Sequence, residues 1–266
     1  MKIQKKISQK ITFFTYEIIS KLSKTIRVNY QNINFKIKTS NSHEVHRALT
    51  FKDKEPETLR WIDNFDLSKG DVVFYDIGAN IGIYSLYAAA KHQGLRVLAF
   101  EPESQSFASL CLNIHHNNLN VTPYPIGISD DDGVAMLNIS ILLPGAGASA
   151  LNESYAFMNN EKIKEFHQGI YHSSINSLVN KNALPIPNYI KIDVDGIEKK
   201  ILHGADVVLQ SSRCVGVLVE LQYKNDEDVD SICRLMKGYG FELSEKSKWI
   251  TEFKGVKSQN FIFNKI

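Results

Sequence analysis

The chain has 266 residues, of which 43% are hydrophobic, and its formal net charge is +2 at pH 7. This length suits one large domain with additions or two small ones, and the apolar content is enough for a sizeable core. The three cysteines, Cys111, Cys214 and Cys233, form no close pair, which argues against a disulfide framework and against a zinc site. We therefore expect a protein of a reducing compartment, most simply the cytoplasm.

Residues 1–30 are strongly basic, because they carry seven Lys or Arg residues and only one acidic residue, Glu17. The segment has a charge of +6, which leaves −4 for the remainder of the chain. Its apolar residues recur at steps of four and three, and this predicts a basic amphipathic helix. They are Ile3, Ile7, Ile11, Phe14, Ile18 and Leu22.

This N-terminal segment is too polar for a membrane-spanning helix and lacks the apolar run and cleavage site of a signal peptide. Two interpretations stay open. The helix packs on the body of the protein or on a second subunit, as in a homodimer, which is the commoner situation. Alternatively, it lies on an anionic membrane surface at the cytoplasmic face.

Residues 31–70 predict a lid or edge on the main domain, with a short hairpin at 27–40 and a helix at 55–65. From residue 71 to the end of the chain, strands alternate with helices, which predicts a parallel sheet with right-handed crossovers. The final two strands fit an antiparallel pair. The expected strands include "DVVFYD" (71–76), "RVLAFE" (96–101), "VTPYPIG" (121–127), "NYIKIDVDG" (188–196) and "VGVLVEL" (215–221).

Residues 134–180 break this rhythm. The sequences "VAMLNIS" and "GAGASAL" predict an extra hairpin, which a polar helical segment to about Gln168 follows. The regular pattern returns afterwards, with one helix expected over 197–210. We therefore describe 134–180 as an insertion in a domain that spans 71–266.

The stretch "FYDIGANIGIYS" (74–85) joins the first strand of the main domain to its first helix. A dinucleotide fingerprint needs GxGxxG, but Asn80 and Ile83 stand where the second and third glycines belong. A triphosphate-binding loop needs a lysine after its last glycine, and none is present. The remaining pattern, DxGxxxG from Asp76 to Gly82, suits a small ligand without a pyrophosphate.

Glu101 ends the second strand, 19 residues after Gly82. An acidic side chain at this place can accept hydrogen bonds from both hydroxyls of a ribose. A lone acid at a strand end is usually a solvated surface group. The order of strand, glycine turn, helix, strand and terminal acid is more specific, and it predicts a nucleoside-containing ligand.

Four stretches together resemble successive motifs of the FkbM family of S-adenosylmethionine-dependent methyltransferases: "FYDIGANIGIYSLYAA", "AFEPE", "IGISDDDG" and "IKIDVDGIEKKILHGA". The resemblance covers about residues 55–225. One departure is Asp195, where the family commonly has glutamate. The resemblance implies an α/β class I methyltransferase fold, Rossmann-like, with a seven-stranded, mostly parallel sheet whose last strand is reversed. The basic N-terminal helix is then an extension outside it.

The resemblance also implies where S-adenosylmethionine binds. The methionine-side turn would consist of Asp76, Gly78, Ala79, Asn80 and Gly82. The ribose and adenine would lie against Glu101 and Pro102, with Gly127, Ser129 and Asp130 near the adenine.

Asp193 and Asp195 follow the fourth strand of the sheet, at the edge where open parallel sheets bind ligands. Asp193 is the first candidate for a general base or a group that orients the acceptor hydroxyl. Alternatively, it binds the donor or caps the turn, and the proton passes to solvent. Glu198 lies in the first turn of a predicted helix, where an acidic side chain is favourable whether or not it takes part in catalysis. Glu220 lies in an apolar strand, where its carboxylate needs a partner.

The histidines form no constellation for a metal, and we expect no metal ion. His167 and His172 lie in the insertion and are weak candidates for a base. A divalent ion held by Asp193 and Asp195 is a further alternative that we do not favour.

The predicted function is methyl transfer from S-adenosylmethionine to a hydroxyl of a sugar, glycan or other small metabolite. The alternatives are an N-methyltransferase and a non-catalytic scaffold protein that binds S-adenosylmethionine. Enzymes that methylate amino groups of nucleic acids usually carry an Asp/Asn-Pro-Pro-aromatic motif after the fourth strand, and this chain has "DVDG" there. The body is slightly acidic, so we expect no nucleic-acid partner.

Overall fold

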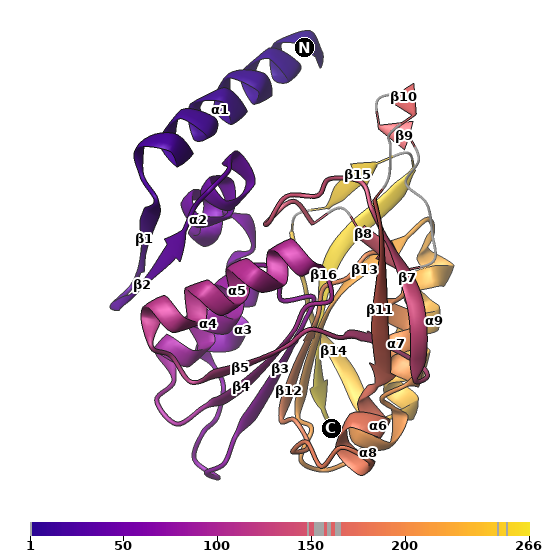
Figure 1. Ribbon diagram of the computed structural model, residues 1–266. Helices are drawn as coiled ribbons and strands as arrows, with labels where there is room; N and C mark the ends of the chain where they lie inside the picture. The colour runs from indigo at the N-terminus through magenta and orange to yellow at the C-terminus, as the bar shows by residue number, and fades with distance from the viewer. Residues whose placement is uncertain are drawn as a thin grey trace.

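Strand β3 (Val73–Ile77) lies inside the main sheet and is buried on both faces. In the computed structural model, β3 lies between β12 and β4 in the main sheet (Figure 1). Val73, Tyr75 and Ile77 pack into one hydrophobic cluster and Phe74 into a second. Side chains alternate across a strand, so an unbroken apolar run is typical of a parallel strand covered on both sides. The structure describes residues 2–147, 149–151, 157–158, 161–162, 166–248, 250–253 and 255–266.

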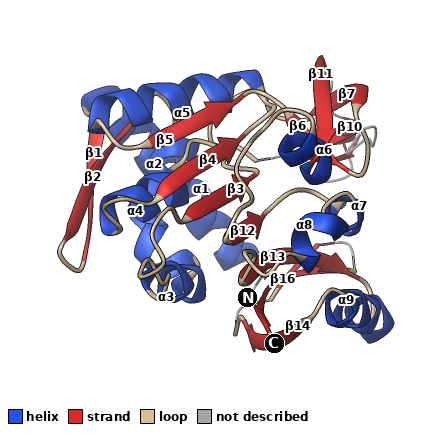
Figure 2. Cartoon of the chain, turned by 90° about the horizontal axis from the view of Figure 1, so that it is seen from below, coloured by secondary structure: helices blue, strands red, loops and turns tan. Residues whose placement is uncertain are grey.

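The main sheet has the strand order β14-β16-β13-β12-β3-β4-β5, which can be followed in Figure 2. Strands β5, β4, β3, β12 and β13 pair in parallel, whereas β16 runs antiparallel to both of its neighbours. Within the described residues, this confirms the predicted seven-stranded sheet with a reversed last strand. A short strand, β15 (Thr251–Phe253), pairs with β16 outside this path. The strands besides β3 are β4 (Arg96–Phe100), β5 (Val121–Tyr124), β12 (Tyr189–Ile192), β13 (Gly216–Tyr223), β14 (Phe241–Lys246) and β16 (Val256–Lys265).

Helices cover both faces of this sheet (Figures 1 and 2). The Phe74 side packs against α3 (Pro56–Asp63), α4 (Ile83–Lys91) and α5 (Ser104–Asn117). The opposite side packs against α6 (Ile175–Asn180), α7 (Glu198–His203), α8 (Asp206–Gln210) and α9 (Asp226–Gly238). The prediction of a single helix over 197–210 was wrong, because the helix is interrupted at Gly204. A Cβ at Gly204 would lie 2.3 Å from the carbonyl oxygen of Ser129.

The N-terminal part consists of α1 (Lys2–Leu22), a hairpin of β1 (Thr25–Tyr30) and β2 (Ile33–Lys38), and α2 (Ser42–Lys54). The N-terminal helix therefore ends at Leu22 and not near residue 30. The sequence analysis did not predict α2. A signal was present, because Asn41 caps the helix by accepting hydrogen bonds from the N–H groups of His43 and Glu44. None of the described helices is long and apolar enough to cross a bilayer.

The insertion forms most of a second sheet with the order β6-β11-β7-β8. The predicted hairpin is confirmed by the antiparallel pairing of β7 (Gly133–Ile139) with β8 (Ser149–Leu151). The predicted helix reaching Gln168 was wrong where the structure describes the chain. Its end lies in strand β11 (Phe166–Ser174), which pairs with β7 and β6 (Gly127–Ser129), and two short strands precede it, β9 (Phe157–Met158) and β10 (Glu161–Lys162). The rest of that prediction lies outside the described residues.

Candidate active site

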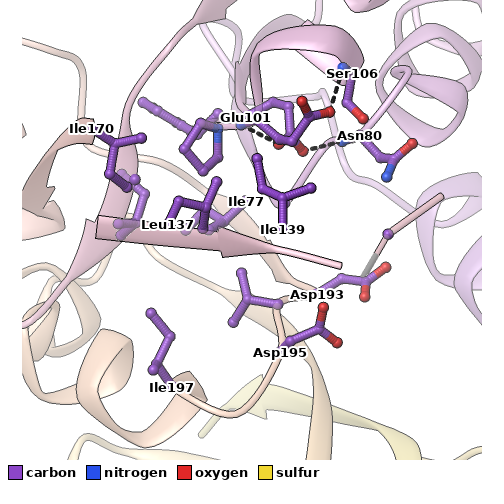
Figure 3. A pocket seen from close by; sticks show the side chains of 18 of the residues that line it. Ile77, Asn80, Glu101, Ser106, Leu137, Ile139, Ile170, Asp193, Asp195 and Ile197 are labelled. Atoms are coloured by element: carbon purple, nitrogen blue, oxygen red, sulfur yellow. Dashed lines mark hydrogen bonds between the residues drawn. The ribbon is translucent and has the colours of Figure 1, made fainter. Parts of the chain in front are cut away.

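A cavity of about 260 Å³ opens at the carboxyl ends of the inner strands of the main sheet. Gly78, Glu101 and Asp193 line it directly after β3, β4 and β12, and Glu220 lines it from β13. Two further segments close the cavity, namely α2 and the second sheet. Figure 3 shows Asn80 and Glu101 on one side, Asp193 and Asp195 on another, and the apolar Leu137, Ile139 and Ile170 beside them. This is the edge at which open α/β sheets bind ligands.

Two glycines shape the turn after β3. Gly78 has a φ of +76°, and a Cβ there would lie 1.9 Å from the carbonyl oxygen of Asp193. Gly82 has a φ of +86°, and a Cβ there would lie 2.4 Å from Cδ1 of Leu110 in α5. Any side chain at either position would clash and strain the backbone, so the turn requires glycine twice.

Glu101 is buried and is held by two backbone amides. Its carboxylate oxygens accept hydrogen bonds from the N–H groups of Asn80 and Glu103, each at 2.8 Å. Burial raises the pKa of Glu101 to about 7, although these two hydrogen bonds oppose the rise. The carboxylate therefore links the turn after β3 to the start of α5 and is fixed in place on the cavity wall.

The structure brings six of the eleven predicted site residues to this cavity. They are Gly78, Asn80, Glu101, Pro102, Gly127 and Asp193. The other five, Asp76, Ala79, Gly82, Ser129 and Asp130, do not line it.

Asp76 lies beneath the turn, where it is 1% exposed and accepts a hydrogen bond from the hydroxyl of Ser85. Burial raises its pKa, while Lys191 lowers it. The position of Asp76 suits support of the turn better than direct contact with a ligand.

Asp193 forms an ion pair with a lysine that is almost completely buried. Nζ of Lys191 lies 2.6 Å from Oδ2 of Asp193 and 5.0 Å from the ring centre of Tyr84. Burial alone would raise the pKa of Asp193, but Lys191 holds it well below its usual range. Asp193 is therefore a permanently ionised acceptor of hydrogen bonds in the cavity.

Glu220 lines the same cavity as Asp193. The negative charge of Asp193, together with burial, raises the pKa of Glu220 well above its usual value. The hydroxyl of Ser258 donates a hydrogen bond to Oε1 of Glu220 at 2.5 Å. Ser258 therefore supplies a partner for an acid in this apolar strand.

Helix α2 adds two cations to the cavity, Arg47 and Lys54. Nε of Arg47 donates a hydrogen bond to the carbonyl oxygen of Gly145 at 2.6 Å. Nζ of Lys54 lies 2.6 Å from Oε1 of Glu55. The sequence analysis identified neither cation, because nothing in their local pattern points to a site. Lys191 was also missed, although a lysine within a buried strand signals a charged partner nearby.

Comparison with known proteins places the chain in a family. The sequence profile of the methyltransferase FkbM domain matches residues 76–243, which is more than half of the chain. The protein belongs to the FkbM methyltransferase family. The predicted family is thereby confirmed, and the cavity described above lies within the matched domain together with α2, which precedes it.

Over the aligned parts, two curated relatives are between a quarter and a third identical to this FkbM methyltransferase. It is 28% identical to 31-O-demethyl-FK506 methyltransferase FkbM of Streptomyces tacrolimicus, over 66% of this chain and 74% of that protein. It is 30% identical to hexuronic acid methyltransferase AglP of Haloferax volcanii, over 53% of each chain, so the match spans about half of AglP. Among solved structures, methyltransferase FkbM of Methylobacillus flagellatus aligns with 14% identity and a TM-score of 0.46, covering 84% of this chain and 53% of that one.

The remaining candidates of the FkbM methyltransferase lie away from the cavity lining. His167 contacts Asn138, and His172 contacts the carbonyl oxygen of Asp131. Glu198 is buried in the first turn of α7, where burial raises its pKa to about 8. Within the described ranges, no group of three or more His, Cys, Asp or Glu side chains is arranged to hold a metal ion.

Proposed function

We propose that this methyltransferase transfers the methyl group of S-adenosylmethionine to a hydroxyl oxygen of a sugar, glycan or other small metabolite. The observation that carries the proposal is the buried Glu101 carboxylate, fixed by two amides on the wall of a cavity that also contains Asp193. The distinct groups along the cavity suit the distinct parts of the donor.

Each part of the donor has a chemically suited group in the cavity. The carboxylate of Glu101 suits the two ribose hydroxyls, and the apolar side chains of Ile128, Leu137 and Ile170 suit the adenine. The ionised Asp193 suits a sulfonium cation. The guanidinium of Arg47 suits the methionine carboxylate, since it is half-buried and none of the described acidic side chains forms an ion pair with it.

S-adenosylmethionine supplies an already activated methyl group, so the protein needs mainly to align the acceptor oxygen and manage its proton. In our proposal, Asp193 accepts a hydrogen bond from the acceptor hydroxyl and orients it. The hydroxyl becomes strongly acidic as the new O–C bond forms, so a carboxylate with a lowered pKa is sufficient as its proton acceptor. The ion pair with Lys191 keeps Asp193 ionised for this task.

The proposed acceptor class rests on two further points. One relative is named for a hexuronic acid and another for 31-O-demethyl-FK506, and both names are consistent with small hydroxylated acceptors. The acceptor side of the cavity also includes Glu220, Lys54 and Asp195, which offer hydrogen-bonding partners to a polyhydroxylated molecule.

The test combines donor binding with transfer. Isothermal titration calorimetry should detect binding of S-adenosylmethionine and of S-adenosylhomocysteine to the full chain. Incubation with a methyl-labelled donor and fractionated extracts should then place the label on a hydroxyl oxygen, as identified by mass spectrometry. Failure to bind the donor would contradict the proposal, and label on a nitrogen would replace the proposed acceptor with the alternative N-methyltransferase activity.

A further inference from the structure

Helix α1 exposes the apolar stripe that its sequence predicts. Of the stripe residues whose side chains are described, Ile11, Phe14, Ile18 and Leu22 are 61%, 67%, 43% and 82% exposed. Figure 1 shows α1 projecting from the body, with α2 beside it. Four large apolar side chains on one exposed helix face form a surface that usually has a partner.

The face that packs on the protein is a different one. The ring of Phe13 contacts the rings of His43 and His46 in α2, and Tyr16 contacts His46. Ser20 on the same face is 1% exposed. With 3.6 residues per turn, these residues lie opposite the apolar stripe. Helix α1 therefore packs on the body of the protein through this face, as one of the two interpretations predicted, while its apolar stripe stays exposed.

We propose that the exposed stripe of α1 lies on an anionic lipid bilayer, in the plane of the interface. The charge of the N-terminal segment favours an anionic bilayer over a second copy of the chain as the partner of this stripe. Residues 1–30 carry +6, and Lys21, whose side chain is 73% exposed, flanks the stripe. There its ammonium group can reach lipid phosphates while the apolar side chains enter the headgroup boundary. A second copy of the chain would bring two +6 segments together, which is electrostatically unfavourable.

The placement of α1 also relates the membrane to the cavity. Helix α2 contacts α1 with His43 and His46. The same helix lines the cavity with Arg47 and Lys54. A bilayer under α1 would thus lie one helix away from the active site. The inference itself does not depend on the proposed function, because it rests only on the exposure and charge of α1.

The test is co-sedimentation of the full chain with vesicles of phosphatidylcholine, with and without phosphatidylglycerol. We expect binding to the anionic vesicles, little binding to the neutral ones, and a loss of affinity as salt is raised. The double variant Phe14→Asp/Ile18→Asp should weaken binding at least a hundredfold, since each buried apolar side chain contributes roughly tenfold. Replacing Lys10 and Lys21 by glutamine should weaken it about fivefold for each charge removed.

Val207→Asp in α8 is the matched control, because it places the same charge on an apolar side chain that is 56% exposed elsewhere. It should bind vesicles like the unmodified chain. Equal binding by the α1 double variant, or no binding of the unmodified chain to anionic vesicles, would overturn the proposal. A stable dimer in analytical ultracentrifugation would also overturn the proposal, if the unmodified chain does not bind vesicles and the double variant no longer forms the dimer. Donor binding, measured separately, should be unchanged in every variant.

Discussion

The two walls of the cavity are built in different ways. The donor wall, which we define as Gly78, Asn80 and Glu101, depends on the backbone of one turn. Glycine conformations shape this turn, and backbone amides donate hydrogen bonds to the buried carboxylate of Glu101. The acceptor wall, defined as Lys54, Asp193 and Glu220, consists of side chains from separate elements, of which Lys54 and Asp193 are held by ion pairs. Changes to the donor wall must therefore disturb the backbone, whereas the acceptor wall can change its chemistry while the fold stays intact.

On the acceptor wall, Asp193 depends on its ion pair with the buried Lys191. Breaking this ion pair should give the largest effect, a loss of folding stability. Lys191→Met would leave Asp193 and Asp76 without their buried counter-charge. Removal of one partner of a buried ion pair typically costs about 3–5 kcal/mol. Urea denaturation should show a loss of this order, whereas Lys200→Met, at an exposed position of α7, should change the free energy of unfolding by less than about 0.5 kcal/mol. A small loss for Lys191→Met would show that the pair does not hold the wall.

The donor wall is tested by Glu101→Gln. The amide keeps the size of the side chain but removes the charge that would accept hydrogen bonds from the two ribose hydroxyls. Its NH2 group also cannot accept one of the two backbone hydrogen bonds that Glu101 accepts. Since hydrogen bonds to charged groups contribute about 1.5–3 kcal/mol each, the affinity for S-adenosylhomocysteine should fall about a hundredfold in calorimetry. The exposed Glu227→Gln in α9 is the matched control and should bind normally. Unchanged affinity of Glu101→Gln would remove Glu101 from the proposed donor site.

This difference between the walls also explains which parts of the site the sequence predicted. The donor wall is contiguous, so Gly78, Asn80 and Glu101 follow each other in an order that the sequence displays. The acceptor wall depends on tertiary contacts. Lys54 reaches the cavity only because α2 lies over the sheet edge. The pairing of Asp193 with Lys191 requires knowing which way each side chain of β12 points.

The same reasoning applies to the fold. The main sheet follows from unbroken apolar strands separated by helices, and the prediction was confirmed in its order of elements. Residues 166–168 were predicted as the end of a polar helix, but they pair with β7 as part of β11, and this tertiary pairing overrides the local preference.

Arg47→Ala tests whether Arg47 binds the donor or the acceptor. If Arg47 holds the methionine carboxylate, loss of a charge-assisted hydrogen bond should weaken donor binding roughly thirtyfold. Arg60→Ala is a suitable control, because Arg60 is an exposed arginine in α3 that pairs with Glu245 on the surface. Unchanged donor affinity together with a higher KM for the acceptor would assign Arg47 to acceptor binding instead.

The smallest expected effect is a pH dependence that belongs to the donor wall alone. Burial raises the pKa of Glu101 to about 7 in the free protein, and ribose hydroxyls that donate to the carboxylate favour its ionised form. Donor binding should therefore be strongest above pH 8 and weaken about tenfold between pH 8 and pH 6, as Glu101 takes up a proton that binding must displace. Asp193 should add nothing in this range, because Lys191 keeps it ionised. Calorimetry of Glu101→Gln should then show affinities independent of pH, and a slope that persists in this variant would assign the titration to another group.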